Sequence, residues 1–212
     1  MPRMHDERSD EALYQAHRDG DRHAATVLYD RYFARVRGYF INKVADPGSC
    51  DDLTQDTFEL ILRKPEAYEG RSTFRAYLFG VGHNKLREHY RKCLQRESED
   101  IEELPVAEIG PGVSTLVAQK AAAQRMIDAL RQLPSQQQSL FEMYYWQELS
   151  GPEIAEIMRC KESTLRSRLR LAKKALLEEL GMPRESLVEL ARSMRDMAGW
   201  IAAVRTQLAE GR

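Results

Sequence analysis

Apolar residues recur every three or four positions along most of this chain, which is the spacing of an α-helix. The first clear example is the run Ala24, Leu28, Tyr32 and Val36. Strand signals are missing, because no stretch alternates steadily between apolar and polar residues and no Asn-Gly or Asp-Gly turn joins two apolar runs. The sequence therefore predicts an all-α fold.

The composition allows a folded protein outside the membrane. The 212 residues are 42% hydrophobic and 31% charged, which is apolar enough to bury cores. No apolar run approaches the roughly 18 residues of a membrane span, and the polar N-terminus has no secretory signal pattern. Cys50, Cys93 and Cys160 lie far apart and match no zinc or disulfide spacing. We expect a cytoplasmic protein with reduced thiols and no membrane insertion.

Helix breakers and an acidic segment divide the chain. Asp46-Pro47-Gly48 ends an early helix, and Asp51 or Asp52 can cap the next one. Residues 97–110 hold six acids and no base, and Gly110-Pro111-Gly112 follows. We predict two small helical domains at residues 10–96 and 116–181, joined by a linker at residues 97–115 and followed by a helical extension at residues 182–212.

Two further helices are expected in the second half. The segment from Gln136 to Trp146 predicts a helix with Leu140, Phe141 and Tyr144 turned inward. In the extension, apolar residues alternate at spacings of three and four from Leu187 to Leu208. Such a seam is expected to cover its own domain, the other domain or another protein.

The strongest local signal is the segment from Leu149 to Leu176. Ser150 and Glu153 form an S-x-x-E capping box before a short apolar helix. After a break around Arg159, residues 159–174 hold seven Lys or Arg against one acid. This pattern is typical of a helix-turn-helix whose second helix enters a DNA major groove, and a plain helical hairpin with a basic face is the alternative. Because many such turns contain glycine, we expect a left-handed conformation at Arg159 or a slightly different turn.

Positions along the second helix suggest separate roles. Residues near the start of a recognition helix reach base edges, and later ones contact phosphates. Arginine presents a fork that suits guanine, whereas lysine is a point charge that suits phosphate. We predict base or near-base contacts for Arg166, Ser167 and Arg170. Phosphate contacts are predicted for Arg168, Lys173 and Lys174.

A second basic helix is predicted over residues 77–96. Residues 83–96 hold five Lys or Arg and one acid, with aromatic residues among them. Such a surface suits single-stranded nucleic acid, because bases stack on rings while cations follow the backbone. Core aromatics at helical spacing are the alternative, and we expect Phe79 in the core. His83 and His89 lack metal-ligand spacing and are expected to face DNA or solvent.

Taken together, these segments resemble bacterial RNA polymerase sigma factors of the extracytoplasmic-function type. The likeness rests, in chain order, on GDRHAATVLYDRYFARVRGYF (20–40), DDLTQDTFELILR (51–63), STFRAYLFGVGHNKLREHYR (72–91) and TLRSRL (164–169). It covers roughly residues 10–180. The chain departs from the family pattern at Tyr77, where tryptophan is usual, at Gly82-His83, and at Leu171, where arginine is frequent.

The resemblance implies a fold of sigma domain two and sigma domain four, the second with the helix-turn-helix. It implies core RNA polymerase, promoter DNA and an anti-sigma protein as partners. The residues implied in polymerase binding are Asp52, Leu53, Gln55 and Asp56. Those implied at the minus-ten element, with the loop from Glu66 to Thr73, are Arg71, Ser72, Tyr77, Asn84, Lys85, Arg87, Tyr90 and Arg91. Those implied at the minus-thirty-five element are Ser163, Thr164, Arg166, Ser167, Arg168, Arg170, Lys173 and Lys174.

Enzyme chemistry is not indicated by the sequence. It contains no nucleophile–base pair, phosphate-binding loop or metal-ligand cluster. We therefore predict a non-enzymatic promoter-recognition subunit without cofactor, metal or catalytic residues. One alternative is a helix-turn-helix repressor or activator that does not contact polymerase. Another is a phosphate-handling hydrolase, which the lack of a Gly-rich loop and of paired carboxylates disfavours.

Overall fold

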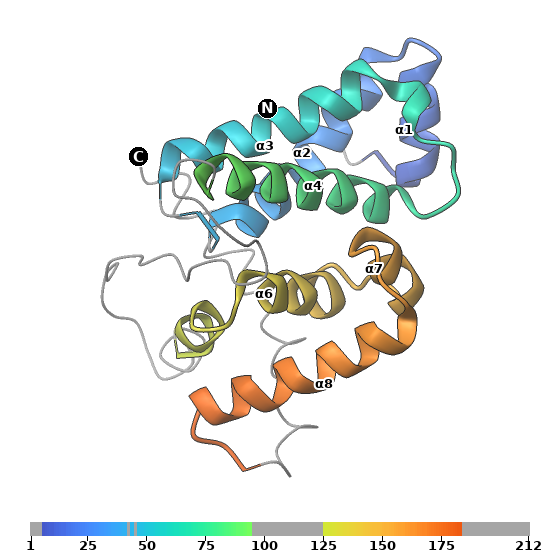
Figure 1. Cartoon of the computed structure of the whole chain (residues 1–212). Helices are drawn as coiled ribbons and strands as arrows, with labels where there is room; N and C mark the ends of the chain where they lie inside the picture. The colour runs from blue at the N-terminus through green and yellow to red at the C-terminus, as the bar shows by residue number, and fades with distance from the viewer. Residues whose placement is uncertain (1–5, 42, 45, 95–124, 184–212) are drawn as a thin grey trace.

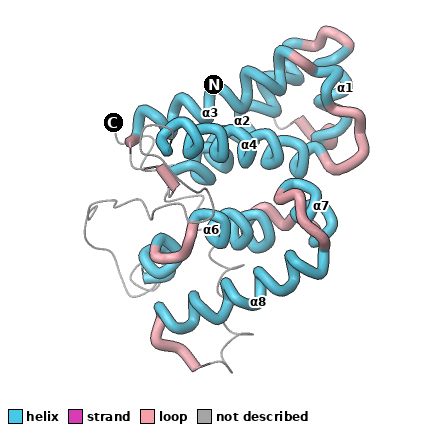
Figure 2. The backbone as a smooth tube through the Cα atoms, in the orientation of Figure 1, coloured by secondary structure: helices cyan, strands magenta, loops and turns pink. Residues whose placement is uncertain are grey.

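The computed structural model describes residues 6–41, 43–44, 46–94 and 125–183. The predicted linker at residues 97–115, and the extension at residues 182–212 beyond its first two residues, lie outside this part. Every regular element in the described part is a helix, as Figure 2 shows, so the all-α prediction is confirmed. Residues 125–131 are helical, and the remaining elements are α1 (Asp10–Arg18), α2 (Arg22–Ile41), α3 (Pro47–Arg63), η1 (Pro65–Ala67), α4 (Phe74–Leu94), α6 (Ser135–Phe141), η2 (Glu142–Trp146), α7 (Gly151–Ile157) and α8 (Glu162–Glu179).

Helices α1 to α4 form the N-terminal bundle. The predicted stripe on α2 is confirmed, because Ala24, Leu28, Tyr32 and Val36 are all buried. Helix α3 begins earlier than predicted. Its N-cap is Asp46, whose Oδ2 accepts the N–H of Ser49 at 2.7 Å, so the prediction that Asp51 or Asp52 caps it is wrong. The reason is Pro47, whose fixed φ and missing N–H suit the first helical position.

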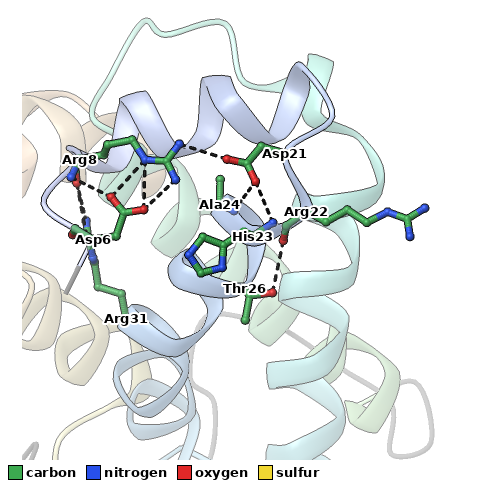
Figure 3. Close-up of polar contacts among 8 residues, drawn as sticks. All are labelled: Asp6, Arg8, Asp21, Arg22, His23, Ala24, Thr26 and Arg31. Atoms are coloured by element: carbon green, nitrogen blue, oxygen red, sulfur yellow. Dashed lines mark hydrogen bonds and ion pairs between the residues drawn. The ribbon is translucent and has the colours of Figure 1, made fainter. Parts of the chain in front are cut away.

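Charged residues tie the segment before α1 to the start of α2 (Figure 3). Arg8 donates to Asp6 Oδ2 at 2.7 Å and to Asp21 Oδ2 at 3.1 Å. Asp21 Oδ1 also accepts the N–H groups of His23 at 2.9 Å and Ala24 at 3.2 Å, and this is the role of an N-cap for α2. The hydrogen bonds from Arg8 lower the pKa of Asp6 to about 2. These contacts join the segment before α1 to the first turn of α2.

The helices of residues 125–183 form the C-terminal unit. Its own core holds residues from three segments, among them Met126, Leu130, Phe141, Ala172 and Leu176. This core attaches α8 to the rest of the unit.

The helix predicted from Gln136 to Trp146 ends differently from expectation. Its last turn, η2, is a π-helix closed by a hydrogen bond from Gln147 N–H to Glu142 O at 2.9 Å. The wider turn rotates the following side chains. Leu140 and Phe141 are buried as predicted, but Tyr145 takes the inward position, and Tyr144 is 39% exposed. The prediction that Tyr144 points inward is therefore wrong.

The C-terminal unit packs directly on the N-terminal bundle. Helix α4 contacts α7, and Figure 1 shows α6, α7 and α8 below α4, with α1 and α3 above it. The core of the bundle continues across this boundary into Leu140, Met143, Ile154 and Leu165. The described residues therefore form one body in which the two groups share apolar packing.

Candidate nucleic-acid interface

Helices α7 and α8 form the predicted helix-turn-helix. The capping box of α7 is present, because Ser150 N–H donates to Glu153 Oε2 at 2.8 Å and Ser150 Oγ accepts from Glu153 N–H at 3.5 Å. In the turn, Arg159 has φ of 52°, which is the left-handed conformation, the first of the two alternatives expected. Cys160 N–H closes the turn on Ala155 O at 2.9 Å. The small, buried Ala155 lies on α7, which packs against α8.

Helix α8 has one apolar side and one polar side. Leu165, Ala172 and Leu176 are buried, which leaves the opposite side of the helix to solvent. The exposed residues among the predicted duplex contacts are Ser163, Thr164, Arg166, Ser167, Arg168, Arg170 and Lys174. Of these, Ser163, Ser167, Arg170 and Lys174 follow spacings of four, three and four and form one outward row. We call it the basic row after its two cations, Arg170 and Lys174, and a straight row of this kind on an exposed helix has the geometry to enter a major groove.

Two cations of α8 make contacts within the unit. Lys173 is half-buried, and its Nζ lies 5.7 Å and 5.4 Å from the ring centroids of Tyr144 and Tyr145. This cation–π contact draws Lys173 toward its own unit. Arg166 donates to Glu162 Oε1 at 2.9 Å, one turn earlier on the exposed surface. An exposed pair of this kind is weak, so Arg166 can exchange it for another acceptor.

Leu171 is the most exposed large apolar side chain among the described residues. It is 56% exposed, beside Arg170 in sequence and three positions before Lys174. Its apolar surface therefore lies in water next to the basic row.

The predicted minus-ten residues divide into exposed cations and packed aromatics. Asn84, Arg87 and Arg91 are exposed at spacings of three and four, so they share one face of α4. Lys85 is half-buried and its Nζ lies 3.2 Å from Asp56 Oδ2 on α3. Arg71 is exposed and pairs with Glu69. These side chains leave a basic surface along α4.

The aromatic members make contacts inside the protein. Tyr77 is half-buried, and its ring lies 5.1 Å from Tyr68 and 6.2 Å from Tyr14. Tyr90 donates its hydroxyl to Lys43 O at 2.6 Å. Ser72 is half-buried and uses its carbonyl to accept the Tyr68 hydroxyl at 2.6 Å. Tyr77 and Tyr90 therefore both contribute to packing inside the protein.

The predicted polymerase-binding residues lie on α3. Asp52, Gln55 and Asp56 are exposed, whereas Leu53 is 7% exposed and belongs to the core. The ion pair between Asp56 and Lys85 places this surface next to the basic surface of α4. Leu53 packs in the core of the bundle and so holds α3 against it.

His83 is buried, so the expectation that it faces DNA or solvent is wrong. It is 4% exposed, and its Nδ1 lies 3.0 Å from the Tyr39 hydroxyl. Burial, assisted by the charge of Arg87, lowers the pKa of His83 to about 4. The physical reason is that α4 contacts α2, α3 and α7, so only part of its circumference remains exposed. Phe79 is in the core as predicted, at 1% exposed.

Four buried polar residues around His83 were not singled out by sequence reasoning. They are Tyr39, Lys43, Ser139 and Glu142, and they link the two groups of helices. One signal was available, because Glu142 is a charged residue between Phe141 and Met143 in an otherwise apolar run. A charge in such a run is expected to have a partner.

The described part of the chain lacks the features of two other kinds of site. Among those residues, no group of three or more His, Cys, Asp or Glu side chains could hold a metal ion. None of the helices described there is both long and apolar enough to span a bilayer.

The family comparisons agree with this geometry. The sequence profile of sigma-70 region 2 matches residues 28–97, and that of sigma-70 region 4 matches residues 123–176. The ECF RNA polymerase sigma factor BldN of Streptomyces coelicolor is 29% identical over 151 residues, which are 70% of this chain and 57% of BldN. The ECF RNA polymerase sigma factor SigK of a Mycobacterium species is 28% identical over 79% of this chain and 87% of SigK.

A solved structure shares the fold. It is the sigma factor RpoE in complex with the anti-sigma factor NepR from Bartonella quintana, with a TM-score of 0.58 and 23% identity. The match covers 75% of this chain and 98% of that one. With regions 2 and 4 matched in order and a helix-turn-helix in the second, this chain belongs to the extracytoplasmic-function group of RNA polymerase sigma factors.

Proposed function

We propose that this chain binds core RNA polymerase and directs it to specific promoters. The observation that carries the proposal is the presence of both sigma-70 regions in one chain, in the family's order. A repressor or activator that acts through the helix-turn-helix alone has no need of region 2. The findings therefore favour transcription initiation over that alternative.

The two groups of helices have separate roles in this proposal. The N-terminal bundle, as domain two over residues 10–96, binds polymerase through α3 and the minus-ten element through α4. The C-terminal unit, as domain four over residues 116–181, binds the minus-thirty-five duplex through α8. The exposed basic residues of α4 and α8 support this division. The residues implied above at each surface are our proposed contacts.

The expected partners follow from the same reading. A sigma factor acts where core polymerase is, so we place the chain in the cytoplasm. Its role is regulatory and not catalytic. A related fold has been solved with an anti-sigma factor bound, and this supports an anti-sigma protein as a partner here.

Reconstituted transcription tests the proposal. The full chain and core polymerase, mixed with a library of promoter fragments, should yield transcripts with defined start sites. Neither the chain nor the core polymerase should give these transcripts alone. The triple variant Asp52→Ala/Gln55→Ala/Asp56→Ala should lose core binding while keeping duplex binding. Glu59→Ala, one turn later on α3, is the matched control and should bind core normally. Duplex binding by the wild type without core binding would support the repressor alternative.

A further inference from the structure

The π-turn of η2 brings an aromatic side chain to the surface of the C-terminal unit. Tyr144 is 39% exposed, while its neighbour Tyr145 is 5% exposed. The two rings meet edge to face at 4.9 Å, and Tyr145 also stacks on Phe141 at 5.7 Å. The turn therefore holds an exposed phenol against a buried ring, and π-turns are frequent at functional sites.

Lys173 approaches this phenol from α8. Its Nζ lies 5.7 Å from the ring centroid of Tyr144 and 5.4 Å from that of Tyr145. Successive residues of a helix are rotated by about 100°, so Lys173 points away from Lys174 of the basic row. It is half-buried. Lys173 therefore lies on the flank of α8, between the basic row and the buried side.

Neither group is neutralised within the unit. Lys174 pairs with Glu178 at 3.5 Å, but among the described residues no carboxylate lies within ion-pair distance of Lys173. Tyr90 donates its hydroxyl to a main-chain carbonyl at 2.6 Å, whereas the Tyr144 hydroxyl makes no hydrogen bond to another described residue. The pair therefore offers an ammonium and a hydroxyl donor to an anion from outside.

The flank of a recognition helix faces phosphates and not bases. The major groove is about 12 Å wide, and a helix with its side chains is about 10–12 Å across, so the helix fills the groove. Its outward row then faces the base edges, and a side chain on the flank faces the phosphates at the rim. Lysine and tyrosine both donate hydrogen bonds to phosphate oxygens. A backbone phosphate of the duplex is therefore the anion that fits this position.

We propose that Tyr144 and Lys173 together bind one backbone phosphate at the rim of the groove that α8 enters. The ammonium of Lys173 supplies the charge, and the hydroxyl of Tyr144 donates a hydrogen bond to the same phosphate. The cation–π contact keeps the ammonium in place. The site fixes the register of α8 on the duplex without reading its sequence. This inference deepens the proposed function and rests on its assignment of α8 to duplex DNA.

Single variants of the full chain separate the hydroxyl from the charge. Binding is measured without polymerase, on a duplex selected from random sequences for binding to the wild-type chain. Tyr144→Phe keeps the ring and should weaken binding about tenfold with the salt slope unchanged, because a hydrogen bond to a charged group is lost. Lys173→Met should reduce the salt slope by about 0.9, because one phosphate is no longer neutralised.

Two variants of the N-terminal bundle are the matched controls. Tyr29→Phe removes the hydroxyl of a tyrosine that is 38% exposed, close to the exposure of Tyr144. Lys64→Met removes one positive charge from an exposed lysine directly after α3. Neither variant should change the affinity for the duplex or the salt slope.

A scan of the DNA backbone locates the phosphate. In each duplex, one phosphate is replaced by an uncharged methylphosphonate. One replacement should weaken binding by the wild type but not by Lys173→Met, and the loss at that position should also be smaller in Tyr144→Phe. At the other contacted phosphates, all three proteins should lose affinity alike.

The outcomes distinguish the phosphate site from the proposed function. Wild-type affinity in Tyr144→Phe, or a scan in which no position distinguishes the wild type from Lys173→Met, would overturn the site and leave the function standing. The expected scan without transcription by core polymerase would overturn the function alone. A wild-type chain that binds no duplex would overturn both.

Discussion

Helices α4 and α8 are both long and basic, but they relate differently to the rest of the molecule. Helix α8 attaches through one apolar side, and its basic row faces solvent. Helix α4 has cations on one face, while His83, Leu78 and Phe79 are buried among its neighbours. Its aromatic Tyr77 and Tyr90 also pack internally. Changes on the exposed side of α8 should therefore alter DNA binding alone, whereas many changes on α4 should alter stability as well.

The largest expected effect concerns His83 on α4. Its folded pKa of about 4 lies below the ordinary 6.5, so the folded state holds the neutral form. Stability is therefore complete above pH 6.5 and falls as the pH drops toward 4, by about 3 kcal/mol in total. Urea unfolding from pH 7 to pH 4 measures this loss. His83→Gln should show a flatter pH dependence, and an identical profile for both proteins would contradict the assignment.

The second-largest effect is expected at Tyr77, whose ring packs inside the protein and is also proposed to contact DNA. Tyr77→Ala should lower the free energy of unfolding by about 2 kcal/mol, because a half-buried ring is lost. It should also reduce open-complex formation at least tenfold while duplex binding by α8 persists. Tyr77→Phe keeps the ring and should be near wild type in both respects. Permanganate footprinting reports the opened bases, and a normal footprint for the folded Tyr77→Ala variant would remove the stacking role.

For the exposed residues of α8 we expect changes in DNA binding without changes in the stability of the fold. Arg170→Ala should cost about 1–3 kcal/mol in minus-thirty-five binding and relax the preference at one base pair. Lys174→Ala, in the same outward row, should weaken binding to all sequences alike and reduce the salt slope by about 0.9. Binding titrations on a set of single-base duplex variants distinguish the two. A uniform loss for Arg170→Ala would show that it contacts phosphate only.

The smallest effect concerns Leu171. An exposed leucine beside the basic row can bury the C5-methyl group of a thymine in the major groove. Replacing one thymine of the minus-thirty-five element by deoxyuridine should then weaken binding by about 0.8 kcal/mol, roughly fourfold. The Leu171→Ala variant should lose this sensitivity at the same position. Equal sensitivity in both proteins would place Leu171 away from the bases.

Local rules predicted much of the fold. The stripe on α2, the capping box at Ser150 and the left-handed turn at Arg159 all follow from a few neighbouring residues. Two of the errors concern local geometry. The π-turn of η2 moved Tyr144 outward, and Pro47 shifted the start of α3 to Asp46.

The sequence by itself determined that the chain is helical, that α7 and α8 form a helix-turn-helix, and that α8 has a basic exposed side. These features depend on periodicity, capping and charge within one or two turns of helix. Only the tertiary structure decided that Tyr39 meets Ser139, that Lys43 meets Glu142, and that His83 is buried beside the Tyr39 hydroxyl. Such partners lie about a hundred positions apart, and no local pattern specifies a pairing that arises only when two separate groups of helices pack together.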